Sequence, residues 1–440
     1  MKLDLENIKA EANKLVDDSL LAKIELTNMV HVKIGGYTAW NYSKELDLME
    51  GLRTSEVKGI WRWWFRAVLG GALWDLQKEP NQQLIVGIVK ELMGSTASAS
   101  KLTLAASHPY VEGSDVNELQ RVPRIRLISL GNGSAAQERI YPPRHLKVDL
   151  LIRELGNVKL DRMNRRVAFG TLLLALLLQG VGAITRRGFG RFQLIIKSCV
   201  NEFQDYCGII NAINQTRNKE EMQRHLETLF NKVLQDAKEK LQQSNKLGTI
   251  ATRSSAIPPF PVFSKDPGVF KFKVLDVKAN KESELLEKLG RACMKLNWKT
   301  YLGLGKYASG ALLDTWILGL PRKVSKTGYY IKNSKEERRP SAIILSPIKK
   351  LQQSFLVAVF GFLSKDWPIK DLQWSSKTKG QHEVTKISNI NKHSTLLNKI
   401  KDHNTRKRFE ECIGQTGDAR IKCAFNIAFD MVERLLTSRQ

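Results

Sequence analysis

Cysteine is scarce in this chain of 440 residues. The five cysteines are odd in number and form no C-x-x-C pair; they are Cys199, Cys207, Cys293, Cys412 and Cys423. This pattern argues against a disulfide framework and against a zinc ribbon, so we expect reduced thiols and a cytoplasmic location. The seven histidines are scattered along the chain, so we expect neither a metal cluster nor a cofactor.

Long hydrophobic runs are also missing. The longest nearly unbroken apolar run covers residues 167–178, which is too short to span a bilayer. The first six residues lack the apolar region of a signal peptide. The sequence therefore predicts no membrane partner.

Negative charge is in short supply: 44 acidic residues stand against 70 basic ones, which gives a formal net charge of +26. Such an excess favours a nucleic acid as the partner. The charge is uneven, because residues 151–200 carry 9 basic and 2 acidic residues and residues 301–350 carry 10 and 3, whereas residues 1–50 are net negative. Two separated basic centres predict two lobes that contribute to one long binding track.

Hydrophobic periodicity places alternating strands and helices in the first 200 residues. The expected strands are 22–33, 101–106, 124–130, 145–153 and 191–197, and the expected helices begin near Ser55 and Met163. This order predicts an α+β fold with a ferredoxin-like β-α-β-β-α-β domain. An antiparallel sheet covered by helices on one face leaves its other face free for a ligand.

The rest of the chain predicts a bridge and a second lobe. Residues 201–254 contain a long amphipathic helix at 217–247, whose apolar face we expect to pack on its own protein. Prolines at 258, 259, 261 and 267 mark a boundary, so we divide the chain into 1–200, 201–254 and 255–440. For the third part we expect a second ferredoxin-like lobe with a helical C-terminal extension. Its expected strands are 269–277, 342–345 and 355–363, and its expected helical regions are 282–296 and 395–438.

Residues 52–67 combine three of the nine tryptophans with four basic residues. In a helix, Lys58, Arg62 and Arg66 fall at i, i+4 and i+8 and form one basic stripe. Ser55 is the expected N-cap, whose helix end could hold a phosphate together with Lys58. A polyanion-binding ridge and a core helix with arginines reaching water both fit the pattern.

The aromatic residues of this stretch divide by helix face. Trp61, Trp64 and Phe65 share one face, so we expect them to be buried and to anchor the helix. Trp63 lies off that face and is the candidate for stacking on a nucleic-acid base.

A glycine-rich stretch at 180–190 is the second candidate site. Gly182, Gly188 and Gly190 would allow backbone N–H groups to approach a phosphate, and Arg186 and Arg187 add charge beside them. The same glycines would also serve as a helix C-cap and a turn into the next strand. In the second lobe, Lys306, Arg338 and Arg339 are candidates for RNA contact or for a solvated loop.

Three segments together resemble the RAMP superfamily, the RNA-binding subunits of CRISPR effector complexes. They are Arg-x-x-x-x-Lys-Gly-x-x-Arg-Trp-Trp-Phe-Arg at 53–66, the glycine-rich loop at 182–190, and Gly-Leu-Pro at 319–321 followed by Arg-Arg-Pro-Ser-Ala at 338–342. The first segment is most similar to the first RAMP subunit of the type III-B (Cmr) complex.

The resemblance implies two ferredoxin-like lobes and a non-catalytic subunit that lies near the 3′ end of the guide RNA and helps to capture target RNA in antiviral defence. Its implied partners are guide RNA, target RNA and the other RAMP subunits. The residues expected to contact RNA are Arg53, Lys58, Arg62, Arg66, Arg186, Arg187, Lys306, Arg338 and Arg339.

Three alternatives remain open from the sequence. A metal-independent, guide-processing endoribonuclease of the same superfamily would use His31, expected on the polar face of the first strand, as general acid or base. A metal-dependent, target-cleaving subunit would use Asp149 and Asp161, although Asp149 lies among basic residues that suggest charge pairing. A general basic protein bound to DNA or ribosomes is the third, although the sequence shows no helix-turn-helix, zinc finger or RNP motif.

Overall fold

The structure is a computed structural model of the 440-residue chain. It describes residues 19–34, 51–77, 80–109, 119, 121–123, 140–155, 159–243, 257–305, 309–320, 322–324, 327–332, 339–378, 381–387 and 397–438. These residues form a mixed α+β fold with three antiparallel sheets, which confirms the predicted fold class. The expected strand at 124–130 lies outside the described residues.

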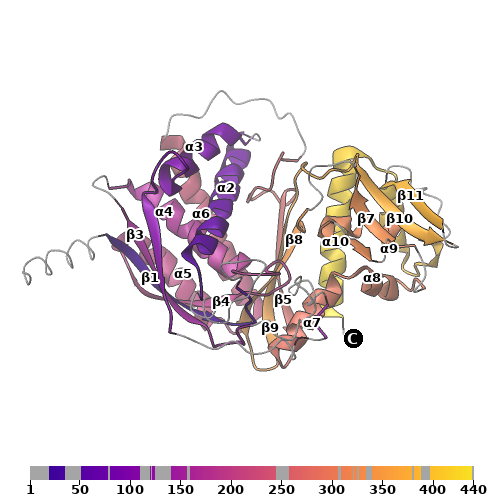
Figure 1. Ribbon diagram of the computed structural model, residues 1–440, viewed down its shortest axis with the longest axis horizontal. Coiled ribbons are helices and arrows are strands. Elements are labelled where there is room, and N and C mark those ends of the chain that lie inside the picture. Colours follow the sequence, from indigo (N-terminus) through magenta and orange to yellow (C-terminus); the bar gives the residue numbers. More distant parts are fainter. Residues whose placement is uncertain are drawn as a thin grey trace, which may run out of the picture.

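The first sheet has the strand order β2-β3-β1-β4, and all its neighbouring strands are antiparallel. Its strands are β1 (Leu20–Asn28), β2 (Leu102–Ser107), β3 (Lys147–Glu154) and β4 (Phe192–Cys199). With helices α2 (Thr54–Gln77) and α4 (Arg162–Leu174), the chain runs β1-α2-β2-β3-α4-β4, the order predicted for this part (Figure 1). The expected strand 22–33 ends early, because the chain leaves the sheet after Asn28.

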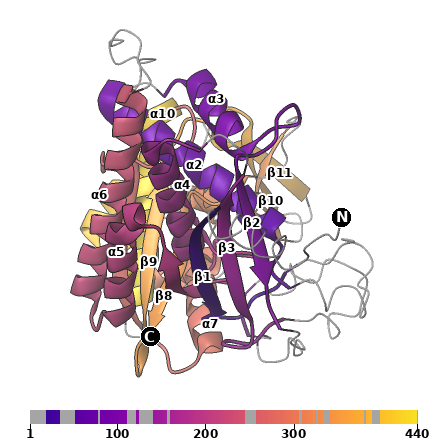
Figure 2. The ribbon, with the colours of Figure 1, turned by 90° about the vertical axis from the view of Figure 1, so that its left-hand side faces the viewer.

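Helices cover one face of the first sheet (Figure 2). Besides α2 and α4 they are α3 (Gln82–Met93), α5 (Gln204–Gln215), α6 (Lys219–Gln243), the π-helical turn η4 (Ala175–Gln179) and the 3₁₀ turn η5 (Asn201–Phe203). The opposite face carries cross-strand ion pairs, Lys23 Nζ to Asp149 Oδ2 at 2.8 Å and Lys197 Nζ to Glu25 Oε2 at 3.0 Å. These charges largely offset one another across the strands.

The second sheet has three strands in the order β5-β9-β8, namely β5 (Phe270–Lys278), β8 (Ile343–Lys350) and β9 (Ser354–Phe362). Every residue of β9 is buried, because helices pack on both faces of the sheet. On one side, Phe360 of β9 lies in the same core cluster as residues of α2 and α6; on the other, Val359 lies with residues of α7 (Glu282–Ala292) and α10 (Gly417–Thr437). The apolar face of α6 thus packs on its own protein, as expected.

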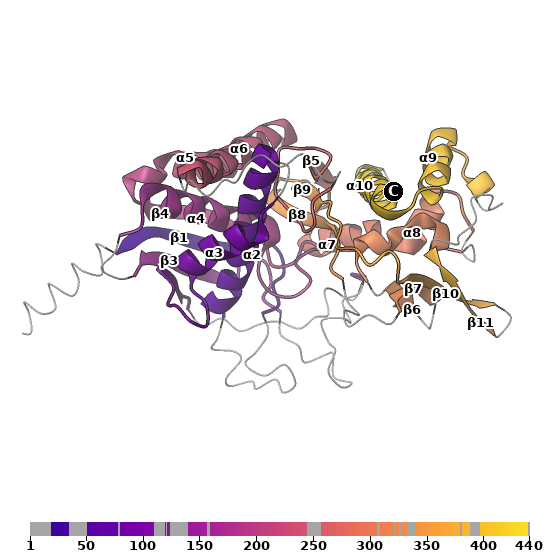
Figure 3. The same cartoon turned by 90° about the horizontal axis from the view of Figure 1, so that it is seen from above.

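The third sheet was not expected from the sequence. Its order is β11-β10-β7-β6, formed by β6 (Arg322–Val324), β7 (Thr327–Ile331), β10 (Leu372–Thr378) and β11 (Gln381–Lys386). It lies at the end of the molecule opposite the first sheet (Figure 3). The remaining helical elements are α8 (Lys295–Tyr301), α9 (His403–Ile413), η6 (Ala311–Leu313), η7 (Thr315–Leu318) and η9 (Leu397–Lys399). The region expected to be helical at 395–438 contains η9, α9 and α10.

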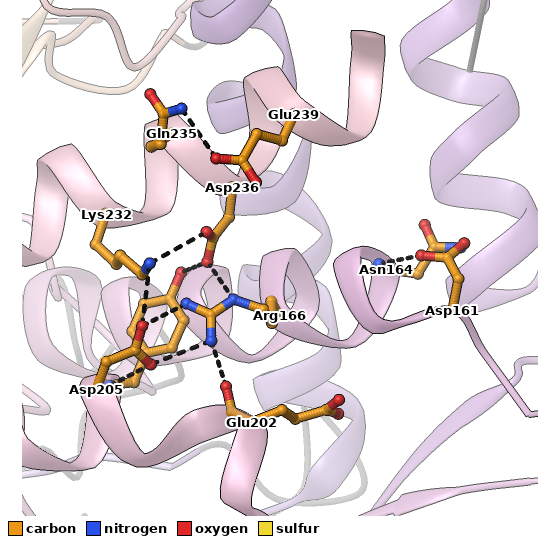
Figure 4. Close-up of polar contacts among 10 residues, drawn as sticks. Asp161, Asn164, Arg166, Glu202, Asp205, Lys232, Gln235, Asp236 and Glu239 are labelled. Atoms are coloured by element: carbon orange, nitrogen blue, oxygen red, sulfur yellow. Dashed lines mark hydrogen bonds and ion pairs between the residues drawn. The ribbon is translucent and has the colours of Figure 1, made fainter. Parts of the chain in front are cut away.

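A buried ion network joins α4, α5 and α6 (Figure 4). Arg166, only 4% exposed, donates to Asp236 Oδ2 at 3.0 Å and to Asp205 Oδ1 at 3.2 Å. Lys232 lies 3.0 Å from Asp205, and the Tyr206 hydroxyl donates to Asp236 at 2.6 Å. Burial by itself lowers the pKa of Arg166, but the two carboxylates outweigh it and raise that pKa above its usual value. Two cations balance two anions, so the network serves to hold three helices together.

The expectation that every cysteine is reduced differs from the structure, which joins Cys199 to Cys207 in a disulfide. The reason is local: the chain turns from the end of β4 through η5 into α5 and brings the two residues together. Cys293, Cys412 and Cys423 are not part of a disulfide. Among the described residues, no helix is both long enough and apolar enough to cross a membrane.

Candidate nucleic-acid interface

The three sequence segments that carry the family resemblance meet at one pocket, which we call the seam pocket. It has a volume of about 150 Å³. Its principal lining residues are Trp63, Arg186, Arg339, Ser341, Phe362 and Trp367. Trp63 comes from α2, Arg186 from the glycine-rich loop, and the others from the second sheet and the chain beside it. The sequence did not predict that these segments converge.

The aromatic face of α2 is core. Trp61 and Trp64 are fully buried and Phe65 is 1% exposed, which confirms the expected anchor. The Trp61 indole N–H donates to Ala168 O at 2.9 Å and so fastens α2 to α4. Trp63 is only partly buried, and its ring centroid lies 5.2 Å from that of Phe362 in an edge-to-face contact.

The basic residues of α2 have different surroundings. Arg66 is exposed, whereas Arg53, Lys58 and Arg62 are partly buried. Burial and the neighbouring charge of Arg62 lower the pKa of Lys58. Arg62 donates to the carbonyls of Met93 and Gly94 and so holds the C-terminal end of α3. Lys58 and Arg66 are therefore the members of the stripe best placed to meet a ligand.

The start of α2 differs from the expectation. The helix begins at Thr54, so Ser55 lies in its first turn and is not the N-cap. The backbone N–H groups of Glu56 and Val57 are bonded to Arg53 O at 3.2 and 3.3 Å, because the chain enters the helix at Arg53.

The glycines of the loop meet strict backbone requirements. Gly182, Gly188 and Gly190 have φ values of +95°, +95° and +68°, a region that favours glycine. The N–H of Gly190 is bonded to His31 O at 3.0 Å and that of Gly188 to Thr185 O at 3.1 Å, so both are used within the fold. The glycine-rich stretch is therefore the turn between η4 and β4, which is one of the two roles expected from the sequence.

The loop arginines reach across to the second sheet. Arg187 Nη2 donates to Leu318 O at 2.7 Å, and Arg186 donates to Ser341 O. In addition, the N–H of Leu345 in β8 donates to Arg186 O at 3.2 Å. Burial and the positive charges of Arg187 and Arg339 lower the pKa of Arg186 to about 10. The loop therefore connects the two halves of the molecule, and its arginines form part of that connection.

Arg191 was not singled out in the sequence. It is fully buried and donates to Thr185 O at 2.6 Å and to Leu345 O at 3.2 Å. Burial and the charge of Arg186 lower its pKa well below the usual value. Arg191 thus supports the glycine-rich loop from inside. An arginine directly after a Gly-Phe-Gly turn and before a strand was the signal available in the sequence.

The second lobe contributes one described candidate, because Lys306 and Arg338 lie outside the described residues. Arg339 forms an ion pair with Asp366, and its guanidinium carbon lies 5.1 Å from the ring centroid of Trp367. Arg339 also exchanges backbone hydrogen bonds with Leu320 at 2.7 and 3.1 Å. Gly319 and Leu320 are thereby neighbours in space of the segment beginning at Arg339.

Lys33 is a second cation that sequence reasoning did not select. Its carbonyl accepts a hydrogen bond from the N–H of Ala183 at 2.9 Å, so it lies beside the glycine-rich loop. Burial lowers the pKa of the Lys33 ammonium group to about 8. Its charge therefore changes near physiological pH.

The three catalytic candidates from the sequence, His31, Asp149 and Asp161, have roles in the fold. His31 is 4% exposed and lies beyond the end of β1, so the expectation of a histidine on the exposed strand face is wrong. Asp149 pairs with Lys23, as the neighbouring basic residues suggested. Asp161 caps α4 by accepting from the N–H of Asn164 at 2.7 Å and pairs with Lys240 at 3.0 Å. Within the described ranges, no group of three or more His, Cys, Asp or Glu side chains could hold a metal ion.

Comparison with known proteins gives a family match for one part of the chain and a shared fold. Residues 52–193 match the RAMP superfamily, which confirms the resemblance drawn from the sequence. No curated protein matches the chain. A chain in the cryo-EM structure of the type III-B Cmr-β complex bound to cognate target RNA is similar with a TM-score of 0.53 at 14% identity, covering 78% of this chain and 94% of that one.

Two further structures are similar. A chain of the same kind of complex with target RNA, AMPPnP and single-stranded DNA has a TM-score of 0.50 at 14% identity, with coverage of 78% and 94%. Cmr1 from Pyrococcus furiosus has a TM-score of 0.48 at 14% identity, with coverage of 83% and 94%. At this level of identity the similarity to the Cmr-β chains establishes a shared fold.

Proposed function

We propose that this chain, whose residues 52–193 match the RAMP superfamily, is a non-catalytic RNA-binding subunit of a cytoplasmic type III-B (Cmr) RNA-guided effector complex. The observation that carries the proposal is the seam pocket, where Trp63, Arg186 and Arg339 from three separate family segments come together. The net charge of +26 supports a polyanionic ligand. The similar chain in a Cmr-β complex bound to target RNA supports the kind of assembly.

Within such a complex, the chain would contact the 3′ region of the guide RNA, help to capture target RNA in antiviral defence, and bind other RAMP subunits. The non-catalytic role is supported by the burial of His31 and by the structural engagement of Asp149 and Asp161. Incubation of the purified protein with repeat RNA in EDTA is expected to leave the RNA intact. Defined cleavage that is lost in His31→Ala would establish the endoribonuclease instead.

We further propose that both lobes are ferredoxin-like, with the division at residues 200 and 254. The first sheet has the order β2-β3-β1-β4 with a helix after β1 and another after β3. The second sheet, β5-β9-β8, repeats three strands of that order, with α7 after β5 and α10 following β9 after the inserted third sheet. Among the described residues, the position beyond β5 has no fourth strand.

RNA affinity is expected to depend on the exposed part of the α2 stripe. The double variant Lys58→Gln, Arg66→Gln should bind single-stranded RNA more weakly, and the slope of log K against log salt should become shallower by about 1.4, since each lost phosphate contact removes about 0.7. Fluorescence anisotropy across a salt series measures both quantities. The matched control is Lys219→Gln, Lys407→Gln, which removes two exposed charges from α6 and α9. Equal slopes in the two double variants would place the RNA elsewhere.

A pH dependence is expected from Lys33. Its ammonium group is protonated at pH 7 and largely neutral at pH 9, because its pKa is about 8. RNA affinity should therefore fall between pH 7 and pH 9, and the salt slope should become shallower by up to about 0.7. The variant Lys33→Arg keeps its charge over this range, so it should retain its affinity at pH 9. If wild type and Lys33→Arg respond equally to pH, Lys33 does not meet phosphate.

A further inference from the structure

The walls of the seam pocket are aromatic. Trp63 reaches it from α2, Phe362 from the end of β9, and Trp367 from the chain that follows β9. Phe362 is 3% exposed and Trp367 is 5% exposed, so both are fixed by the surrounding core. Trp316 holds Trp367 from behind, with ring centroids 5.4 Å apart. Rigid aromatic side chains of this kind are the surfaces on which unstacked nucleic-acid bases stack.

Two guanidinium groups lie over these rings. The guanidinium carbon of Arg186 is 6.0 Å from the ring centroid of Trp63, and that of Arg339 is 5.1 Å from that of Trp367. Of the arginines gathered here, Arg339 has a described carboxylate partner, Asp366. Arg186, Arg187 and Arg191 instead donate to backbone carbonyls. The polar side of the pocket therefore has a net positive charge, which suits the phosphates that flank a bound base.

The volume limits what can enter. A cavity of about 150 Å³ is of the size that holds a single benzene-like ring. A pyrimidine has one six-membered ring, whereas a purine has two fused rings. The pocket therefore accommodates a pyrimidine base and leaves its ribose and phosphates outside, beside the arginines.

We propose that the seam pocket binds one unstacked pyrimidine base of an RNA strand, held against Trp63 and the neighbouring aromatic wall, while Arg186 and Arg339 contact the flanking phosphates. This inference rests on the proposed RNA-binding function and adds a base-binding site to it. It makes the junction between the first and second sheets part of the RNA track.

The test uses the full chain and three RNA strands of equal length: one with abasic ribose at every position, one with a single central uridine, and one with a single central adenosine. Fluorescence anisotropy at one salt concentration measures their affinities. We expect the uridine to tighten binding on the order of tenfold over the abasic strand, as stacking of one base does. The adenosine should give a smaller gain, because the second ring does not fit.

Two variants change the pocket in opposite ways. Trp63→Leu removes the flat stacking surface but keeps an apolar side chain, and Pro340→Phe places a large ring at an exposed lining position. Both keep Arg186 and Arg339, and in both the ratio of the uridine-strand affinity to the abasic-strand affinity of the same variant should fall to about one. Pro340→Phe keeps the test decisive if Trp63→Leu proves unstable, because Pro340 is exposed.

Each result decides between the two proposals. The base-binding pocket is overturned if uridine does not increase the affinity of the wild type over that for the abasic strand, or if this increase persists in Pro340→Phe. In either case, binding of the abasic strand would still support RNA binding. If adenosine increases the affinity over the abasic strand as much as uridine does, the pocket does not select a pyrimidine. A wild-type protein that binds none of the strands, nor ordinary single-stranded RNA, overturns the proposed function itself.

Discussion

Replacing Asp236 by alanine is expected to lower the free energy of unfolding by about 3–5 kcal/mol, as removal of one partner from a buried ion pair does. Asp236 is 2% exposed and accepts hydrogen bonds from Arg166 at 3.0 Å and from the Tyr206 hydroxyl at 2.6 Å (Figure 4). Without it, Arg166 keeps only the partly exposed Asp205 as a carboxylate partner, and the Tyr206 hydroxyl loses its acceptor. The contacts between α4, α5 and α6 weaken together.

Thermal denaturation followed by circular dichroism measures this effect, with an expected fall in the midpoint of about 3–5 °C. The matched control is Gln235→Ala, one residue earlier on α6. Gln235 forms an exposed hydrogen bond to Glu239 at 2.9 Å, so its loss should change the free energy of unfolding by less than about 0.5 kcal/mol. Equal midpoints for the two variants would mean that the network adds little to the stability of the helical layer.

Replacing Gly190 by alanine is expected to lower the free energy of unfolding by about 2–4 kcal/mol and to weaken RNA binding as well. Gly190 has φ of +68°, and a Cβ atom there would lie 1.9 Å from Val181 O. The backbone must therefore shift, and the Gly190 N–H bond to His31 O shifts with it. Because Arg186 is on the same loop, its place at the seam pocket is disturbed too.

Gly208→Ala provides the control for the second prediction. Gly208 lies in α5, and a Cβ atom there would meet nothing within 4 Å. Alanine should stabilise this helix by about 0.5–1 kcal/mol and leave RNA affinity unchanged. Denaturant titration and anisotropy on the same preparations measure both effects. Were Gly190→Ala as stable as wild type with unchanged RNA affinity, the conformation of the loop would not matter for the interface.

The sequence predicted the first sheet well because its signals are local. Alternating apolar residues in β1 and β3 and the paired aromatic and basic faces of α2 depend on neighbours within a few positions. The third sheet was missed because β6, β7, β10 and β11 are short strands whose pairing depends on contacts between distant residues. The disulfide was missed for a related reason, since the turn between β4 and α5 brings Cys199 to Cys207.

For the candidate residues, the sequence predicted which side chains carry positive charge, but it did not predict which groups those side chains contact. The sequence indicates that Arg62, Arg186 and Arg187 are cations in family segments. It does not indicate that Arg62 holds the end of α3 or that Arg187 donates to Leu318 O. Arg191 was not selected because the sequence does not show that the arginine after the Gly-Phe-Gly turn is buried.

Composition and sequence periodicity were enough to predict the basic character of the protein, its α+β class and the aromatic anchor of α2. These follow from composition and from periodicity along one segment, which local backbone geometry converts directly into a buried or exposed face. The pocket shared by Trp63, Arg186 and Arg339 depends instead on long-range packing. Their positions are separated by more than a hundred residues in the chain, and the packing of the second sheet against α2 and the glycine-rich loop is what brings them together.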